Sequence, residues 1–127
     1  MSPAHERKHL VWVGSCRKDL QTFPQPVQRI VGYALHIAQI GGRHPTTTTL
    51  KGQHGAGVVE IIEDHDGDTF RLVYTVRLKE RIYALHAFQK KSKRGIATPK
   101  KELDLIERRL REAEEIHRRW LESEGGG

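Results

Sequence analysis

The spacing of apolar and polar residues divides the first half of the chain into one extended and one helical segment. Residues 9–16, HLVWVGSC, are rich in β-branched and aromatic side chains and close with glycine and serine, which predicts a short strand. From Pro24 to Gly42, apolar residues recur every three or four positions between a proline and a glycine pair, which predicts an amphipathic helix. Residues 41–57 have no such period and are predicted to form a loop with a short extended piece.

Residues 57–88 show the two-residue period of β-strands. The segments GVVEIIED and DTFRLVYTV flank Asp66-Gly67, two residue types that tolerate positive φ in a hairpin turn. A second turn, RLKE, leads into RIYALHAF. We therefore expect a three-stranded antiparallel meander.

The last segment returns to a helical period. Thr98 is predicted to be the N-cap, with Pro99 at the first helical position. Apolar residues then recur at three- and four-residue steps between many glutamates and arginines, namely Leu103, Ile106, Leu110, Ala113 and Trp120. At 127 residues the chain has the length of one domain, which we expect to span residues 1–124, with a flexible tail at 125–127.

Charge narrows the classes of partner. The net charge of +6 and the pI of about 9.7 favour an anionic partner, either nucleic acid or an acidic protein. Cys16 is the single cysteine and lacks the partner pattern of a nucleophile, and no Cys/His spacing suggests a metal site, so we expect no metal and no cofactor. The charged N-terminus and the absence of an apolar run near ~20 residues predict a cytoplasmic protein with no membrane partner.

The positive charge is concentrated after the third strand of the meander. Between Phe88 and Glu102 there is no acidic residue, and six basic ones occur: Lys90, Lys91, Lys93, Arg94, Lys100 and Lys101. An aromatic ring beside several cations suits single-stranded RNA, whose bases stack on rings while lysines follow the phosphates. The alternative is a core phenylalanine followed by a solvated basic loop.

Arg71 is the second candidate. The alternation of DTFRLVYTV places it on the strand face opposite Phe70, Leu72 and Tyr74. A fixed guanidinium there can grip a phosphate with two parallel hydrogen bonds. The alternative is an arginine that reaches solvent or pairs with a glutamate such as Glu60.

The arginine of FRLVY, the strand ending in aromatic-x-Lys-Lys, and the Thr-Pro that opens a helix with Glu102 resemble, in this order and spacing, the RelE/ParE toxin superfamily. Within it the chain is most similar to the phage-derived, HigB-like toxins of type II toxin-antitoxin systems, from about Val11 to Arg119. The resemblance implies a compact α+β domain with N-terminal helices, an antiparallel or mixed sheet and a long C-terminal helix.

The resemblance also implies an activity, that of a ribosome-dependent mRNA endoribonuclease. In this chemistry the ribose 2′-OH attacks the adjacent phosphate without a metal, and cations stabilise the phosphorane that forms. The resemblance assigns catalysis to Arg71, Lys90 and Lys91, and RNA contacts to Lys51, Phe88, Lys93 and Arg94.

The general base stays open, because no tyrosine follows the basic run. A lysine of lowered pKa in that run is the first candidate, with Tyr83 and His86 as weaker alternatives, and His86 is better explained as a satisfied histidine of the sheet.

The implied partners are a cognate helix-turn-helix antitoxin, the ribosome and mRNA. Two other functions stay open: a ParE-like inhibitor of DNA gyrase, and a non-catalytic, phage-derived nucleic-acid-binding protein. The combination of Arg71 with Lys90 and Lys91 argues against the gyrase inhibitor, because a toxin that only binds protein does not need it.

Overall fold

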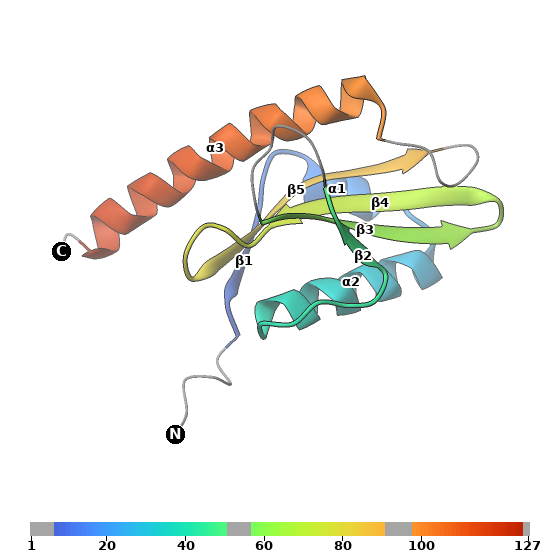
Figure 1. The fold of residues 1–127 in the computed structure, drawn as a ribbon, viewed down its shortest axis with the longest axis horizontal. Helices are drawn as coiled ribbons and strands as arrows, with labels where there is room; N and C mark the ends of the chain where they lie inside the picture. The colour runs from blue at the N-terminus through green and yellow to red at the C-terminus, as the bar shows by residue number, and fades with distance from the viewer. Residues whose placement is uncertain (1–6, 51–56, 91–97, 126–127) are drawn as a thin grey trace.

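The computed structural model describes residues 7–50, 57–90 and 98–125. A five-stranded sheet of order β1-β5-β4-β3-β2 lies between α2 on one face and α3 on the other (Figure 1). The elements in chain order are β1 (His9–Trp12), α1 (Cys16–Leu20), α2 (Gln25–Gln39), β2 (Thr47–Thr49), β3 (Val58–His65), β4 (Asp68–Thr75), β5 (Arg81–Lys90) and α3 (Lys100–Gly125). The predicted α+β class, the mixed sheet, the N-terminal helices and the long C-terminal helix are confirmed.

The predicted meander is also confirmed, since β3, β4 and β5 pair in antiparallel fashion with consecutive neighbours. The hairpin between β3 and β4 turns at Asp66 and Gly67, whose φ angles are 50° and 83°. Two successive positive φ values belong to the tight turn whose twist matches that of the flanking strands. The Asp-Gly pair therefore fixes the register of the hairpin.

The edges of the sheet are less regular than its centre. The first strand ends at Trp12 and pairs with β5 in parallel, and its predicted last residue, Cys16, instead begins the short helix α1. At the other edge β2 pairs with β3 and is the short extended piece expected in the loop. Helix α3 continues through Gly125, and residues 126–127 of the predicted tail lie outside the described residues.

Each face of the sheet buries its own apolar cluster. On one face, α1 and α2 cover Phe70, Leu72 and Tyr74 of the central strand. On the other face, α3 covers a second cluster that includes Val73, Tyr83, Leu85, Phe88, Ile106, Leu110 and Ala113. The alternation in β4 thus separates the two clusters as the sequence predicted.

A β-bulge in β5 determines which side chains face α3. Val73 pairs with His86, but the next residue, Tyr74, pairs with Ala84, so Leu85 is an extra residue opposite them. Because side chains alternate along a strand, one extra residue exchanges the two faces for everything beyond it. Leu85 and Phe88 consequently both join the cluster under α3, and His86 turns toward that helix.

Arg109 of α3 binds this bulge. Its Nη1 donates a hydrogen bond to the Leu85 carbonyl at 3.0 Å, and its Nη2 donates to Ser15 Oγ at 3.0 Å. Gly14 lies beside it with a φ of 56°, where a Cβ atom would come within 2.8 Å of Arg109 Nε. Gly14 therefore meets two requirements, a left-handed backbone and a close approach to Arg109.

We expect Gly14→Ala to lower the free energy of unfolding by about 2–4 kcal/mol in urea titrations. The left-handed conformation costs roughly 1–2 kcal/mol with a Cβ atom, and displacing Arg109 removes hydrogen bonds worth about 1 kcal/mol each. Gly67→Ala is the matched control, because Gly67 also has a positive φ of 83° but no atom within 4 Å of the added Cβ. Equal losses in the two variants would show that the contact with Arg109 contributes nothing.

The C-terminal half of α3 attaches to the sheet through His117. Its Nδ1 lies 2.9 Å from the Tyr83 hydroxyl, and the Arg81 guanidinium lies 4.0 Å from the Trp120 ring centre. Burial lowers the pKa of His117, the charge of Arg81 lowers it further, and Glu80 partly opposes the shift. The lowered pKa favours the neutral imidazole, whose Nδ1 accepts a hydrogen bond from the Tyr83 hydroxyl.

This shift predicts a loss of stability in mild acid. Below about pH 6.5 the unfolded chain binds a proton at His117 that the folded chain binds less readily, so the stability that is present above this pH decreases as pH falls. We expect His117→Gln to reduce the change in urea midpoint between pH 7 and pH 5, because glutamine can accept the Tyr83 hydrogen bond but does not titrate. An unchanged pH dependence in His117→Gln would contradict this.

Candidate nucleic-acid site under the start of α3

Two groups of polar side chains lie side by side on the sheet face that α3 covers. One consists of Glu60, Arg71 and Thr98, and the other of His86 and Glu102. Arg71 of β4 is paired with Phe88 of β5, and the next residue on the same face, Val73, is paired with Glu60 and His86. Residues directly opposite each other on neighbouring strands point to the same side of the sheet. The pairing therefore places Glu60, Arg71 and His86 together under the first turn of α3.

Arg71 is buried in a network with one residue from β3 and one that precedes α3. Its side chain is 4% exposed, and Nη1 lies 3.3 Å from both Glu60 Oε2 and Thr98 Oγ1. The Thr98 hydroxyl is also 3.1 Å from the same carboxylate oxygen, to which it donates. Of the two interpretations of Arg71, pairing with Glu60 is the one that the structure shows, and this pairing fixes the guanidinium in place.

The prediction that Thr98 caps α3 is wrong. The amide of Leu103 donates to the Pro99 carbonyl at 3.0 Å, and the helix begins at Lys100, which puts Pro99 at the N-cap position. The Thr98 hydroxyl is instead directed at Arg71 and Glu60, because these buried charged groups offer stronger hydrogen bonds than a backbone amide does.

His86 forms the second polar group. Its Nε2 lies 2.7 Å from Glu102 Oε1, in the first turn of α3, and its ring stacks on Phe88 with centroids 4.9 Å apart. An ionised carboxylate only accepts hydrogen bonds, so Nε2 carries the hydrogen, and in a neutral imidazole Nδ1 then keeps its lone pair. Among the described residues, Nδ1 has no hydrogen-bond partner.

Of the other proposed site residues, the structure describes only Lys90 and Phe88. Lys90 is the last residue of β5 and is paired with Thr69, two positions beyond Phe88. Phe88 itself is 8% exposed and belongs to the core cluster under α3, so its ring packs against the protein. Four residues of the prediction lie outside the described residues, namely Lys51, Lys91, Lys93 and Arg94.

Two further sequence candidates lie away from this site. Tyr83 is five residues before Phe88 on β5, about 17 Å along the strand at roughly 3.3 Å per residue, and contacts His117. Cys16 is fully buried, and burial raises the pKa of its thiol to about 12. Neither side chain is placed to act on a group bound near Arg71.

Sequence reasoning missed the roles of Glu102 and Thr98 at this site. Glu102 was visible only as part of a motif, and its contact with His86 depends on the bulge in β5. Within residues 7–50, 57–90 and 98–125 no three His, Cys, Asp or Glu side chains are arranged to hold a metal ion. No helix in this part of the chain is both long and apolar enough to cross a bilayer.

Comparison with protein families gives one match. A model of the family described as phage-derived protein Gp49-like (DUF891) matches residues 18–111, which include the three strands of the meander and the first turns of α3. No curated protein matches the sequence. The matched region contains every residue of the two polar groups described above.

Proposed function

The chain belongs to the family of phage-derived Gp49-like proteins, and from this premise we propose that it is the toxin of a type II toxin-antitoxin system that cleaves mRNA on the ribosome. The resemblance to HigB-like toxins of the RelE/ParE superfamily supports this proposal. The structural observation on which the proposal depends most is the Glu60-Arg71-Thr98 network beside the His86-Glu102 pair, at the end of the sheet where the basic segment begins.

Arg71 supplies positive charge to the scissile phosphate. Its guanidinium is already oriented by Glu60, and a charge fixed in a site of low dielectric stabilises a developing phosphorane more strongly than one in water. Lys90 at the end of β5, and Lys91, the next residue in the sequence, are proposed to add positive charge. Lys51, Lys93 and Arg94 are proposed to contact the RNA backbone.

His86 is the proposed general base. Its Nδ1 takes the proton of the ribose 2′-OH, the 2′-oxygen bonds to phosphorus, and the 5′-oxygen leaves with a proton from a neighbouring lysine, which yields a cyclic phosphate. Glu102 holds the Nε2 hydrogen and stabilises the imidazolium that forms. The pairing of a carboxylate with a histidine whose second ring nitrogen keeps its lone pair is the arrangement that this proton transfer requires.

Access of RNA to this site requires Thr98, which precedes α3, to move away from the sheet while Glu102 keeps its hydrogen bond to His86. Arg71 and His86 are 4% and 5% exposed, and the groups that cover them, Thr98 and Glu102, are held by the same hydrogen bonds that order the site. A phosphate that binds Arg71 replaces the Thr98 oxygen at the guanidinium, while Glu60 continues to orient it. The negative charge of the substrate thus favours the open arrangement.

The proposed partners follow from the activity. The ribosome presents the mRNA, a cognate helix-turn-helix antitoxin neutralises the toxin, and the protein acts in the cytoplasm, where ribosomes and mRNA are found.

The test is to induce the protein in bacteria and follow labelled amino acid, uridine and thymidine incorporation over the first minutes. We expect amino-acid incorporation to stop first while thymidine incorporation continues. Thymidine incorporation that stops first would contradict the proposal and favour a gyrase inhibitor.

A further inference from the structure

The exposed face of α2, on the side of the sheet opposite α3 (Figure 1), carries cationic and aromatic side chains. No Asp or Glu occurs from Leu20 to Val59, a stretch that includes the whole of α2. Arg29, Tyr33 and His36 follow each other at helical spacing along the outer side of the helix. The stretch that forms this surface thus contributes no acidic side chain, unlike the outer side of α3, where arginines alternate with glutamates.

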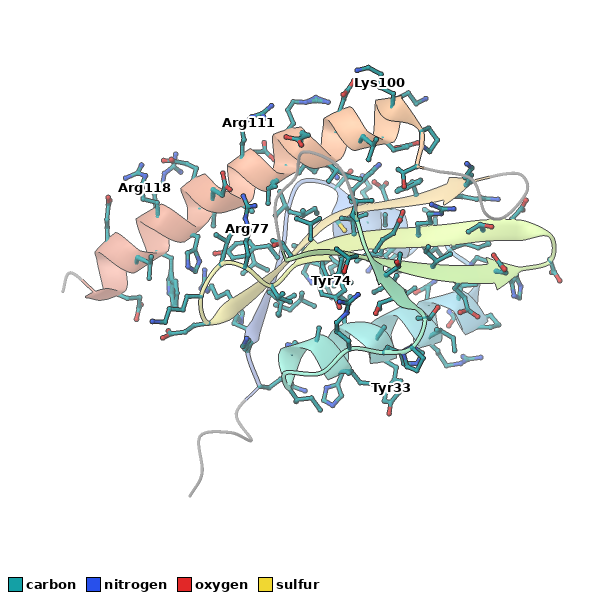
Figure 2. All side chains as sticks on the ribbon, in the orientation of Figure 1. Tyr33, Tyr74, Arg77, Lys100, Arg111 and Arg118 are labelled. Carbon is teal, nitrogen blue, oxygen red and sulfur yellow. The ribbon has the colours of Figure 1, made fainter. Side chains whose placement is uncertain are left out.

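Tyr33 is the central feature of this surface. Its side chain is 57% exposed and points away from the sheet (Figure 2). The ring meets His44 edge to face, with centroids 5.6 Å apart and planes at 85°. His44 is in turn fixed, because the Thr46 amide donates to its Nδ1 at 3.1 Å. One flat face of a large aromatic ring is thus presented to solvent in a defined orientation.

Arg43 extends the surface beyond the end of α2. Its Nη1 and Nε donate to the hydroxyls of Thr49 and Thr47 at 3.3 and 3.4 Å, which orients the guanidinium. It lines a depression of about 270 Å³ together with Lys8 and Thr49, and none of the described residues that line it is a carboxylate.

The carboxylates nearest in sequence are engaged elsewhere. Asp19 accepts a hydrogen bond from Ser15 at 2.8 Å, and Glu60 pairs with Arg71 on the far side of the sheet. Among the described residues no carboxylate forms an ion pair with Arg29 or Arg43, so both guanidiniums are available to an external anion.

We propose that this surface, formed by Arg29, Tyr33, His36, Arg43 and Lys8, binds single-stranded RNA. A base stacks on Tyr33, and the phosphates on either side contact Arg29 and Arg43. An exposed ring between two arginines, of which Arg43 is oriented by Thr47 and Thr49, matches a chain that alternates flat bases with negative charges. An acidic protein would match the charges but would not need the ring. The surface is separate from the cleavage site and would hold RNA whether or not the protein cleaves it.

The test measures fluorescence anisotropy of a labelled single-stranded 2′-O-methyl oligonucleotide, which lacks the nucleophile and so cannot be cleaved. Tyr33→Ala is expected to weaken binding roughly tenfold, while Tyr33→Phe binds like the wild type because stacking is retained. Arg29→Ala with Arg43→Ala is expected to reduce the slope of log affinity against log salt by roughly 0.7 for each phosphate that the protein no longer neutralises. Arg111→Ala is the matched control, an exposed arginine on the outer side of α3 (Figure 2).

Wild-type affinity in Tyr33→Ala, or an equal loss in Arg111→Ala, would overturn the inference. The same outcomes leave the cleavage proposal standing if the wild type still cuts mRNA. Conversely, the protein could bind RNA in a Tyr33-dependent manner without cutting mRNA. That result would support RNA binding by this surface and contradict only the proposed nuclease activity.

Discussion

Arg71→Ala is expected to abolish toxicity and to lower the free energy of unfolding by about 3–5 kcal/mol, because it leaves the Glu60 carboxylate buried without its counter-charge. Both side chains are 4% exposed and lie 3.3 Å apart, so water cannot replace the missing guanidinium. Growth after induction and urea titration of the purified protein measure the two effects. A loss of toxicity in this variant alone therefore does not separate chemistry from folding.

The double variant Glu60→Gln/Arg71→Met makes that separation. It removes both charges at similar volume, and such replacements of buried ion pairs are often close to neutral in stability. The glutamine introduced in place of Glu60 can also accept the hydrogen bond that Thr98 donates in the wild type. We expect this variant to unfold near the wild-type urea midpoint and to remain non-toxic. Toxicity in a stably folded double variant would show that Arg71 has no part in catalysis.

His86→Gln is expected to lower the cleavage rate by roughly 10²–10⁴-fold, the range that a general base contributes. Glu102→Gln is expected to cause a smaller loss, since glutamine keeps a hydrogen bond to the imidazole but does not stabilise its protonated form. Affinity for an uncleavable oligonucleotide should stay unchanged in both variants. This division between rate and affinity distinguishes proton transfer from a structural role in holding α3.

Tyr83→Phe is the control for this prediction. It removes a buried hydroxyl from the same strand at the His117 end, and the cleavage rate should not change. A rate loss in Tyr83→Phe equal to that in His86→Gln would move the general base away from His86.

The features that the sequence predicts well are those determined by neighbouring residues. The alternation in β4 separates Arg71 from Phe70 and Leu72, and Asp66-Gly67 specifies the hairpin, because both depend on local conformational preferences. Helix α3 is likewise predicted from neighbouring residues, because its apolar side chains recur at three- and four-residue steps. The apolar pattern alone does not show the short helix α1, because five residues are too few for a helical period, and the N-terminal helices were implied by the family resemblance.

The features that sequence reasoning missed depend on residues far apart in the chain. The bulge at Leu85 has no local signal, and its carbonyl is bound by Arg109 of α3. Without the bulge, alternation from Tyr83 would place His86 against α2 rather than beside Glu102. Likewise, the pattern gives the face on which Arg71 lies but not that Thr98 covers it. The candidate site is therefore a product of tertiary packing more than of any single motif.

The central claim is tested most directly by primer extension on a reporter mRNA in a bacterial translation extract, with the wild type and with Glu60→Gln/Arg71→Met, in the presence and absence of active ribosomes. We expect cuts in phase with codons that require both ribosomes and the wild-type protein. Intact mRNA with the wild type, or the same cuts with the double variant, would contradict the account.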